Sequence, residues 1–528
     1  MKKWTVVIIL ALAQFVMILD STVMNVSISK VVTDLHTSVT AMQAAITFYT
    51  LTMAALMLIG AKLGTIWGRK KAFVIGAIIY ACGSLITGLS QNIQMLFLGW
   101  SVIEGIGAVL VIPAIAALIA NNYQGQARIK AYAMIGAVSG LAVAAGPLIG
   151  GFMTTYLSWR YVFFGEVVIM AIILLFRNQL KDSTKPIKQK IDLTSALESS
   201  FGLVFIVFAL LQSKTWGWIT PRQAPVLFGH EITPLGISLV PYLILLGIIL
   251  LKLFFDRQNK LIAQKKPALL DPSLLSIKRL RSGLSVLMAQ YAITAAIFFV
   301  IPVYLQMTLG YDALKTGIKI FPLSFSLIIF SLVGTRLSST WSPKKIVRFG
   351  QLLLILGSGV LLASINIDLR GWLFGTAIFI VGAALGLLAS QLGNVNMSSV
   401  KEEKSSEVGG LQGVFQNLGS SLGVALIGSV MISSLSTNFN DSIQASALPS
   451  TTKNTVSEQS QKGIAIVPIS EVNSIATQNG LTPSETQTAT QIYSDSQISA
   501  LKESLYALLF ISIVTLFFSK NIPDEIVK

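Results

Sequence analysis

The sequence has 528 residues, of which 53% are hydrophobic and 12% charged, and its formal net charge is +16. Soluble domains carry roughly 25% charged residues, so this composition, with a mean hydropathy of +0.72, excludes an ordinary soluble protein. The single cysteine, Cys82, excludes a disulfide framework and a cysteine metal site.

Fourteen apolar runs predict an all-α integral membrane protein. Most runs have the length of a bilayer-spanning helix, about 20 residues, and the ten-residue alternation of barrel strands is absent. The first run carries Asp20 and lacks a convincing cleavage site, so it is interpreted as a span and not as a signal peptide. The runs cover residues 5–29, 44–64, 72–90, 95–120, 131–153, 161–176, 194–212, 234–255, 282–305, 317–335, 346–366, 371–395, 409–434 and 504–519.

The distribution of basic residues predicts the orientation. Fourteen spans place both termini on one side of the membrane, and with a cytoplasmic N-terminus the cytoplasmic segments hold 29 of the 39 Lys and Arg residues. These segments include 177–190 and 252–281. This positive-inside bias explains the basic charge without a nucleic-acid partner.

An internal repeat predicts the grouping of the spans. GAKLGTIWGRKK (60–71) and GTRLSSTWSPKK (334–345) each follow one apolar run and precede the next. Eight spans separate the copies, so two six-span bundles flank an inserted pair. The predicted units are the N-terminal bundle (1–177), a linker with spans 7 and 8 (178–256), a cytoplasmic linker (257–281) and the C-terminal bundle (282–528). The polar segment 435–503 of the last unit is an external loop, a helical hairpin or disordered.

Span 1 contains an acidic motif, LDSTVMNVS at 19–27, which includes Asp20, Ser21, Thr22 and Asn25. An ionised carboxylate inside a span costs roughly 2.5–3.5 kcal/mol on insertion scales, unless it faces a wet cavity or holds a proton. Helical spacing places Met17 and Met24 on the face of Asp20. Asp20 is therefore a candidate for proton coupling or substrate binding, and a structural carboxylate paired with a neighbouring helix is the alternative.

Two further motifs lie at a loop and in span 5. LGTIWGRKK (63–71) combines Gly68, which permits a tight turn, with the cations Arg69, Lys70 and Lys71, which suit a cytoplasmic gate or simply fix topology. In span 5, GPLIGG (146–151) follows Ala142. Gly150 and Gly151 permit close helix approach, and Pro147 bends the helix so that one end can hinge. Helix packing alone is the alternative role of this motif, which begins at Gly146.

These motifs resemble those of the major facilitator superfamily, specifically its fourteen-span drug:proton antiporter family (EmrB/QacA type). The three segments are similar to the family's "LDxTxxNVALP", "GxLaDrxGrkr" and "GxxxGPxxGG". The resemblance implies the major facilitator fold and a monomer in the cytoplasmic membrane of a prokaryote. It also implies a small-molecule substrate, protons as the coupling ion, a proton gradient in place of a cofactor, and no metal site.

The sequence departs from the family pattern at several positions, among them Ser29 and Lys30 at the end of the span 1 motif and Ala142 at the first glycine of the span 5 motif. Thr65 replaces the aspartate of the loop motif and Ser101 the arginine of span 4, while Glu104 and Glu166 stand at glutamine and asparagine positions. The N-terminal half thus holds three intramembrane acids and no matching cation. Either Glu104 and Glu166 are neutral structural acids, or they form a protonatable cluster with Asp20, because burial and mutual repulsion favour the protonated forms.

The function predicted from these features is proton-coupled export of small amphiphilic, cationic compounds. Export of an endogenous lipid, siderophore or metabolite is the alternative within transport. A membrane-embedded enzyme would need a nucleophile–base pair, a metal set or a phosphate loop, and two histidines with one cysteine assemble none of these. A non-transporting sensor would need a soluble output domain, for which 257–281 is too short.

Overall fold

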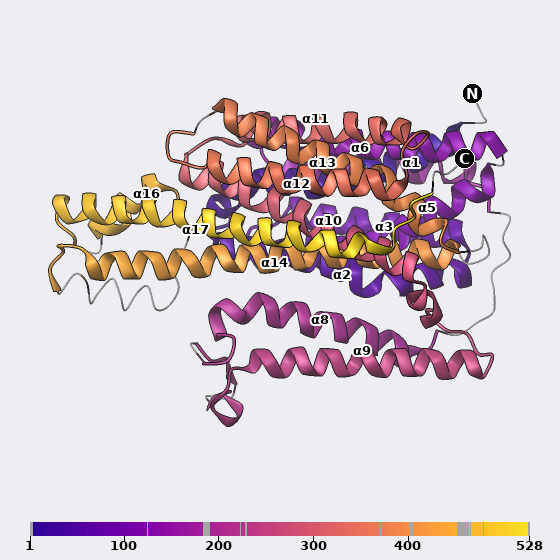
Figure 1. Cartoon of the computed structure of the whole chain (residues 1–528), viewed down its shortest axis with the longest axis horizontal. Coiled ribbons are helices and arrows are strands. Elements are labelled where there is room, and N and C mark those ends of the chain that lie inside the picture. Colours follow the sequence, from indigo (N-terminus) through magenta and orange to yellow (C-terminus); the bar gives the residue numbers. More distant parts are fainter. Residues whose placement is uncertain are drawn as a thin grey trace.

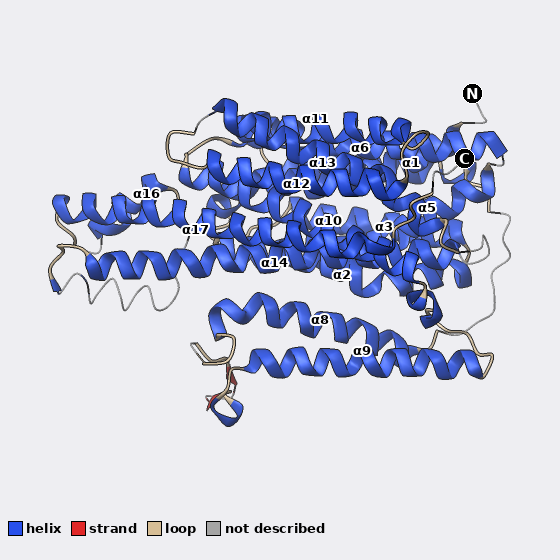
Figure 2. Ribbon diagram, viewed as in Figure 1, coloured by secondary structure: helices blue, strands red, loops and turns tan. Residues whose placement is uncertain are grey.

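Long helices run side by side through the computed structural model, and Figure 2 shows that helix accounts for nearly all of the regular structure. The structure describes residues 4–123, 125–182, 191–221, 223–227, 230–369, 371–400, 405–450, 453, 464, 466–478 and 480–525. Residues 183–190, which are part of the basic segment 177–190 that supported the predicted orientation, lie outside these residues. The β structure in the described part is one antiparallel pair of two-residue strands, β1 (Val226–Leu227) and β2 (His230–Glu231).

The N-terminal third forms one group of packed helices. α1 packs on α6, and α3 packs on α5 and α7. The π-helix η1 continues α4 into α5, so that these three elements together make one span. The helices are α1 (Thr5–Asp34), α2 (Val39–Trp67), α3 (Arg69–Gly88), α4 (Ile93–Leu96), η1 (Phe97–Glu104), α5 (Gly105–Asn122), α6 (Gly125–Tyr156), α7 (Arg160–Leu175) and the short 3-10 helix η2 (Arg177–Gln179).

An antiparallel pair of helices, α8 (Leu193–Trp216) and α9 (Leu239–Ala263), follows and lies beside the main group (Figure 1). The two helices pack chiefly on each other, while α8 also contacts α2 and α14. At one end of this pair Asp192 caps α8 and bonds Arg257 of α9, with N–O distances of 2.5 and 2.7 Å. These hydrogen bonds hold the pKa of Asp192 below its usual range.

The C-terminal half repeats the packing of long helices. The segment 257–281, predicted as a linker, is helical at both ends, because α9 continues to Ala263 and α10 begins at Lys278. The elements are η3 (Pro234–Gly236), η4 (Pro272–Ser276), α10 (Lys278–Val303), η5 (Tyr304–Thr308), α11 (Ala313–Leu337), α12 (Pro343–Ser364), α13 (Gly371–Met397), α14 (Ser405–Ala445), α16 (Ile469–Gln478), α17 (Pro483–Phe518) and η7 (Ser519–Asn521).

Polar side chains fix where many of these helices begin. Ser38, Asp312 and Ser342 each accept a hydrogen bond from a backbone N–H of the first turn of α2, α11 and α12. α17 begins with a capping box, in which Thr482 and Glu485 satisfy each other's backbone N–H groups. The apolar runs set the helix type, and these caps set the starting residues.

Thirteen helices in the described part of the chain are long and apolar enough to cross a bilayer. The predicted span at 161–176 coincides with α7, whose 16 residues extend about 24 Å at 1.5 Å per residue, less than the bilayer core of about 30 Å. The multi-span membrane architecture is therefore confirmed, and the number fourteen stays a prediction.

The polar segment 435–503 forms a helical hairpin in its described residues. α14 has 41 residues and α17 has 36, so at 1.5 Å per residue they reach about 60 and 54 Å, well beyond one bilayer core. Their outer ends carry α16 and project from the rest of the protein (Figure 1). The apolar residues Ile464 and Val467 pack against the core at its base.

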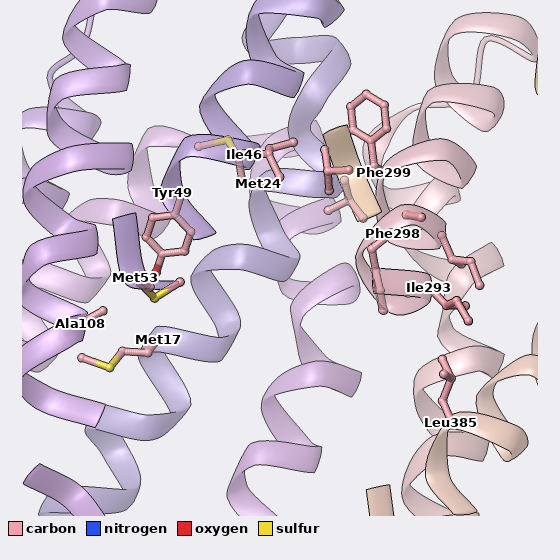
Figure 3. Packing of buried hydrophobic residues seen from close by; sticks show 14 of the residues in the cluster. Met17, Met24, Ile46, Tyr49, Met53, Ala108, Ile293, Phe298, Phe299 and Leu385 are labelled. Carbon is pink, nitrogen blue, oxygen red and sulfur yellow. The ribbon is translucent and has the colours of Figure 1, made fainter. Parts of the chain in front are cut away.

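One hydrophobic core extends through both halves of the chain. Figure 3 shows its middle, where side chains of α1 and α2 lie on one side and side chains of α10 on the other. Methionines are prominent on the N-terminal side, and Met17, Met24 and Met53 are at most 7% exposed. Flexible thioethers of this kind adapt readily to different shapes.

Hydrogen bonds also join the two halves of the chain. Gln306 of η5 donates to the Val26 carbonyl at 2.7 Å and accepts from the Ser29 N–H at 3.1 Å. Gln43 of α2 donates to the Val424 carbonyl of α14 at 3.0 Å. These contacts hold α1 and α2 against the C-terminal half.

Candidate functional site

Three fully buried carboxylates meet inside the N-terminal half. Asp20 lies on α1, Glu104 ends the π-helix η1, and Glu166 lies on α7, each with at most 1% of its surface exposed. One oxygen of each lies within 4.8 Å of the others. The structure thus brings together the three acids that the sequence suggested as a cluster, which we call the carboxylate triad.

The donors around the triad are few and neutral. The indole Nε1–H of Trp100 donates to both oxygens of Asp20 at 2.9 Å, and the Ser84 hydroxyl donates to Glu166 at 3.0 Å. Both oxygens of Glu104 and the second oxygen of Glu166 have no hydrogen-bond partner in the part of the chain that the structure describes. Among the described residues, no Lys or Arg forms an ion pair with any of the three acids.

Glycines let the neighbouring helices close around the triad. A Cβ at Gly83 of α3 would lie 2.6 Å from the backbone nitrogen of Glu104, and one at Gly107 of α5 would lie 2.5 Å from that of Tyr80. Only glycine permits backbones this close. The contact places η1 and α5 directly against α3.

The other residues of the span 1 motif bond within α1. The Ser21 hydroxyl donates to the Ile18 carbonyl, that of Thr22 to the Leu19 carbonyl at 2.8 Å, and the Asn25 amide to the Ser21 carbonyl. Asn25 Oδ1 is buried and unpartnered. Asp20 alone of this motif enters the triad, so the motif presents one acid and otherwise shapes the helix surface.

The glycine-rich motif of α6 lies between α1 and α11. A Cβ at Gly146 would lie 1.8 Å from Thr22 Oγ1, and one at Gly150 would lie 2.9 Å from the Val23 Cα. On its other side, a Cβ at Gly151 would lie 2.7 Å from the Ala313 carbonyl of α11. The motif therefore links the helix that carries Asp20 to the C-terminal half.

The loop motif turns at Gly68, whose φ of +93° is in the region that favours glycine. Arg69 donates to the Ala117 carbonyl at 3.2 Å, and the Lys70 N–H donates to Asp182 at 3.0 Å. The Thr65 hydroxyl bonds its own helix at Lys62. Thr65 thus makes no link across the loop, whereas Asp182 anchors the start of α3.

The sequence was also compared with models of known protein families. The model described as Major Facilitator Superfamily matches residues 10–424. The chain belongs to the major facilitator superfamily. It is therefore a multi-span membrane transporter of small molecules, as the motifs predicted.

Several relatives of this transporter are antibiotic exporters or resistance proteins. The probable actinorhodin transporter of Streptomyces coelicolor is 26% identical over 84% of this chain and 75% of its own. The puromycin resistance protein pur8 of Streptomyces alboniger is 29% identical, over 81% of this chain and 82% of its own. The tetracenomycin C resistance and export protein of Streptomyces glaucescens is 25% identical and covers 99% of this chain and 93% of its own.

Solved structures show the same fold at low identity. An inward-facing, unoccupied bacterial homologue of the human lysosomal transporter Spinster superposes with a TM-score of 0.60 at 13% identity, over 99% of this chain and 98% of that one. A D-xylose–proton symporter superposes with a TM-score of 0.58 at 11% identity, with the same coverage of both chains. These matches support the helical arrangement of the transporter and nothing about its substrate.

Sequence reasoning missed several residues of the site. Trp100, Ser84 and Tyr80 lie around the triad, but an aromatic or hydroxyl group in an apolar span gives no signal of its partner. Asp182, which accepts a hydrogen bond from the Lys70 N–H, was also missed. It could have been found as an acidic residue in the otherwise basic segment that follows span 6. In the C-terminal half Gln290 and Gln391 donate to carbonyls of neighbouring helices, the adhesive role expected of such residues.

Proposed function

We propose that this transporter exports small amphiphilic cations, including drugs and toxic compounds, in exchange for protons. The observation that carries the proposal is the carboxylate triad, which is fully buried and has no cationic partner in the described chain. The export and resistance roles named for several relatives support the direction and the substrate class.

Electrostatics favours exchange over simple binding at the triad. Two ionised carboxylates 4.8 Å apart repel each other by about 3.5 kcal/mol at an effective dielectric constant of 20, and three such pairs are costly. The triad relieves this repulsion by taking up protons or by accepting a cation. A proton and a cationic substrate therefore compete for the same carboxylates, and that competition is the basis of antiport.

The surroundings suit a range of amphiphiles. Met17 and Met24 flank Asp20 on α1, and Met53 lies nearby on α2 in the core shown in Figure 3. Thioether side chains adapt their shape and remain apolar, so the triad supplies charge recognition and the methionines supply an adjustable apolar contact.

The setting proposed for this activity is the cytoplasmic membrane of a prokaryote, with both termini in the cytoplasm. The basic segments described above support that orientation. We further propose that the protein works as a monomer, with the proton gradient as its energy source and without a cofactor.

The test is substrate-induced proton movement in proteoliposomes. Adding ethidium or tetraphenylphosphonium should drive protons in the opposite direction for the wild type and for Asp256→Asn, which alters an exposed acid of α9. Asp20→Asn should insert normally and abolish the proton movement. If a panel of amphiphilic cations moves no protons through the folded wild type, the proposal is wrong.

A further inference from the structure

Trp100 connects the triad to the rest of the N-terminal half. Its side chain is 1% exposed, and its single N–H donates to both oxygens of Asp20 at 2.9 Å. The ring stacks on Tyr49 of α2 with a centroid distance of 4.9 Å and an interplanar angle of 11°. Stacking of this kind fixes the plane of the indole and hence the direction of its N–H.

Trp100 and Glu104 share one face of η1. The hydrogen bonds of this π-helix run from residue i to i+5, and residues four apart lie on one face, as they do in an α-helix. Trp100 and Glu104 are four apart, and both are directed to the triad. Ser101, the next residue, points elsewhere and donates to the Ala45 carbonyl of α2 at 2.8 Å.

We propose that Trp100 is a positioning residue that holds Asp20 and sets its proton affinity through a neutral donor. An indole N–H stabilises an ionised carboxylate but carries no charge and does not titrate. A guanidinium would neutralise one acid and repel a cation. The inference rests on the proposed function in one respect, because it explains why the triad accepts a cationic substrate.

Other groups that face Asp20 from the surrounding helices also influence its proton affinity. They are Glu104 of η1, Glu166 of α7, Tyr49 of α2 and Tyr80 of α3. The facing part of α6 contributes Gly146, which carries no polar side chain. The Trp100 N–H donates to Asp20 at 2.9 Å, and Tyr49 and Glu104 also interact with Asp20, so the Trp100 variants must keep the contact with Tyr49.

The experiment measures protonation of Asp20 directly. Infrared titration of the carboxyl stretch in lipid, with the spectrum of Asp20→Asn subtracted, reports proton binding without transport. Trp100→Phe keeps an aromatic ring against Tyr49 and removes the N–H, so the proton affinity of Asp20 should rise about tenfold, the smaller effect expected for losing a hydrogen bond to a charged group. Trp159→Phe is the matched control, because Trp159 is equally buried and donates to Asp34 at 3.2 Å, away from the triad.

A second pair of variants separates the hydrogen bond from packing. Trp100→Gln and Trp100→Met have similar size and flexibility, but only Gln offers neutral N–H donors. Proton affinity near that of the wild type in Trp100→Gln, and raised in Trp100→Met, supports the proposal. Equal affinities in the two variants, or an unchanged affinity in a folded Trp100→Phe, overturn it.

The outcome stays separate from that of the proposed function. If Asp20 titrates as expected but no cation moves protons through the protein, the antiport proposal fails and the role of Trp100 stands. If proton-coupled export is present and the Trp100 variants leave the titration of Asp20 unchanged, the inference about Trp100 fails alone.

Discussion

Gly146 of the glycine-rich motif offers a direct test of how α6 packs against the helix that carries Asp20. A Cβ at this position would lie 1.8 Å from Thr22 Oγ1 and 2.7 Å from Thr22 Cβ. Thr22 cannot easily turn away, because its hydroxyl donates to the Leu19 carbonyl at 2.8 Å. Gly146→Ala must therefore push α6 away from α1 at Thr22, which is two residues after Asp20.

Overpacking of this kind costs about 1–3 kcal/mol. We expect Gly146→Ala to lower the melting temperature of the purified protein in detergent and to reduce proton-coupled export by more than the loss of folded protein accounts for. Gly359→Ala in α12 is the control, since nothing lies within 4 Å of its new Cβ.

A double-mutant cycle with Thr22→Gly locates the effect. Removing the threonine side chain frees the space that the alanine needs, so the two changes together should cost less than the sum of the single costs by at least about 0.5 kcal/mol. Additive costs, or a Gly146→Ala protein that melts and transports like Gly359→Ala, would refute the close packing of α6 on α1.

Other expectations follow from the same geometry. Glu104→Gln or Glu166→Gln should lower the number of protons exchanged per cation. A second proton adds about 1.4 kcal/mol per pH unit and about 2.3 kcal/mol per 100 mV, so the attainable substrate gradient should fall several-hundred-fold. A gradient unchanged in both variants would make these acids structural. Cys82→Ser should leave transport largely intact, because Cys82 is exposed on α3, and a folded but inactive variant would contradict this. In the Cys82→Ser background, Lys71→Cys and Ser484→Cys should react with an impermeant maleimide from opposite sides, and labelling from one side would remove the predicted topology. Arg257 holds the pKa of Asp192 below its usual range. The stabilisation of the α8–α9 pair by this ion pair should therefore be complete above about pH 4 and lost as the pH falls further. An Asp192→Asn protein that melts at the wild-type temperature at pH 7 would argue against this stabilisation.

Much of the architecture follows from local sequence. The apolar runs had to be helices, because a helix satisfies its own backbone hydrogen bonds in lipid, and the described helices coincide with the predicted runs. The buried acid in span 1 and the glycines of 146–151 were recognisable from composition alone, since charge is costly and small residues are useful inside a membrane.

The ends of the helices were less predictable. The sequence of 435–503 is polar, and polarity is compatible with a loop, a hairpin or disorder. The described part is helical because α14 and α17 continue as a pair, with Tyr493 packed on Phe439 and bonded to the backbone at Val467. Such pairing depends on residues more than 50 positions apart and leaves no local pattern.

Only the tertiary structure decided how the candidate site is built. Asp20, Glu104 and Glu166 belong to three helices, and their convergence within 4.8 Å depends on how those helices cross. The donor to Asp20 was hidden in the sequence. Trp100 and Glu104 are four residues apart and share one face of η1, but the meeting of this face with Asp20 depends on how η1 packs against its neighbours, among them Gly83 of α3. The physical reason is that a sequence fixes the spacing of side chains along one helix, whereas the register between helices is set by the close contacts that their glycines allow.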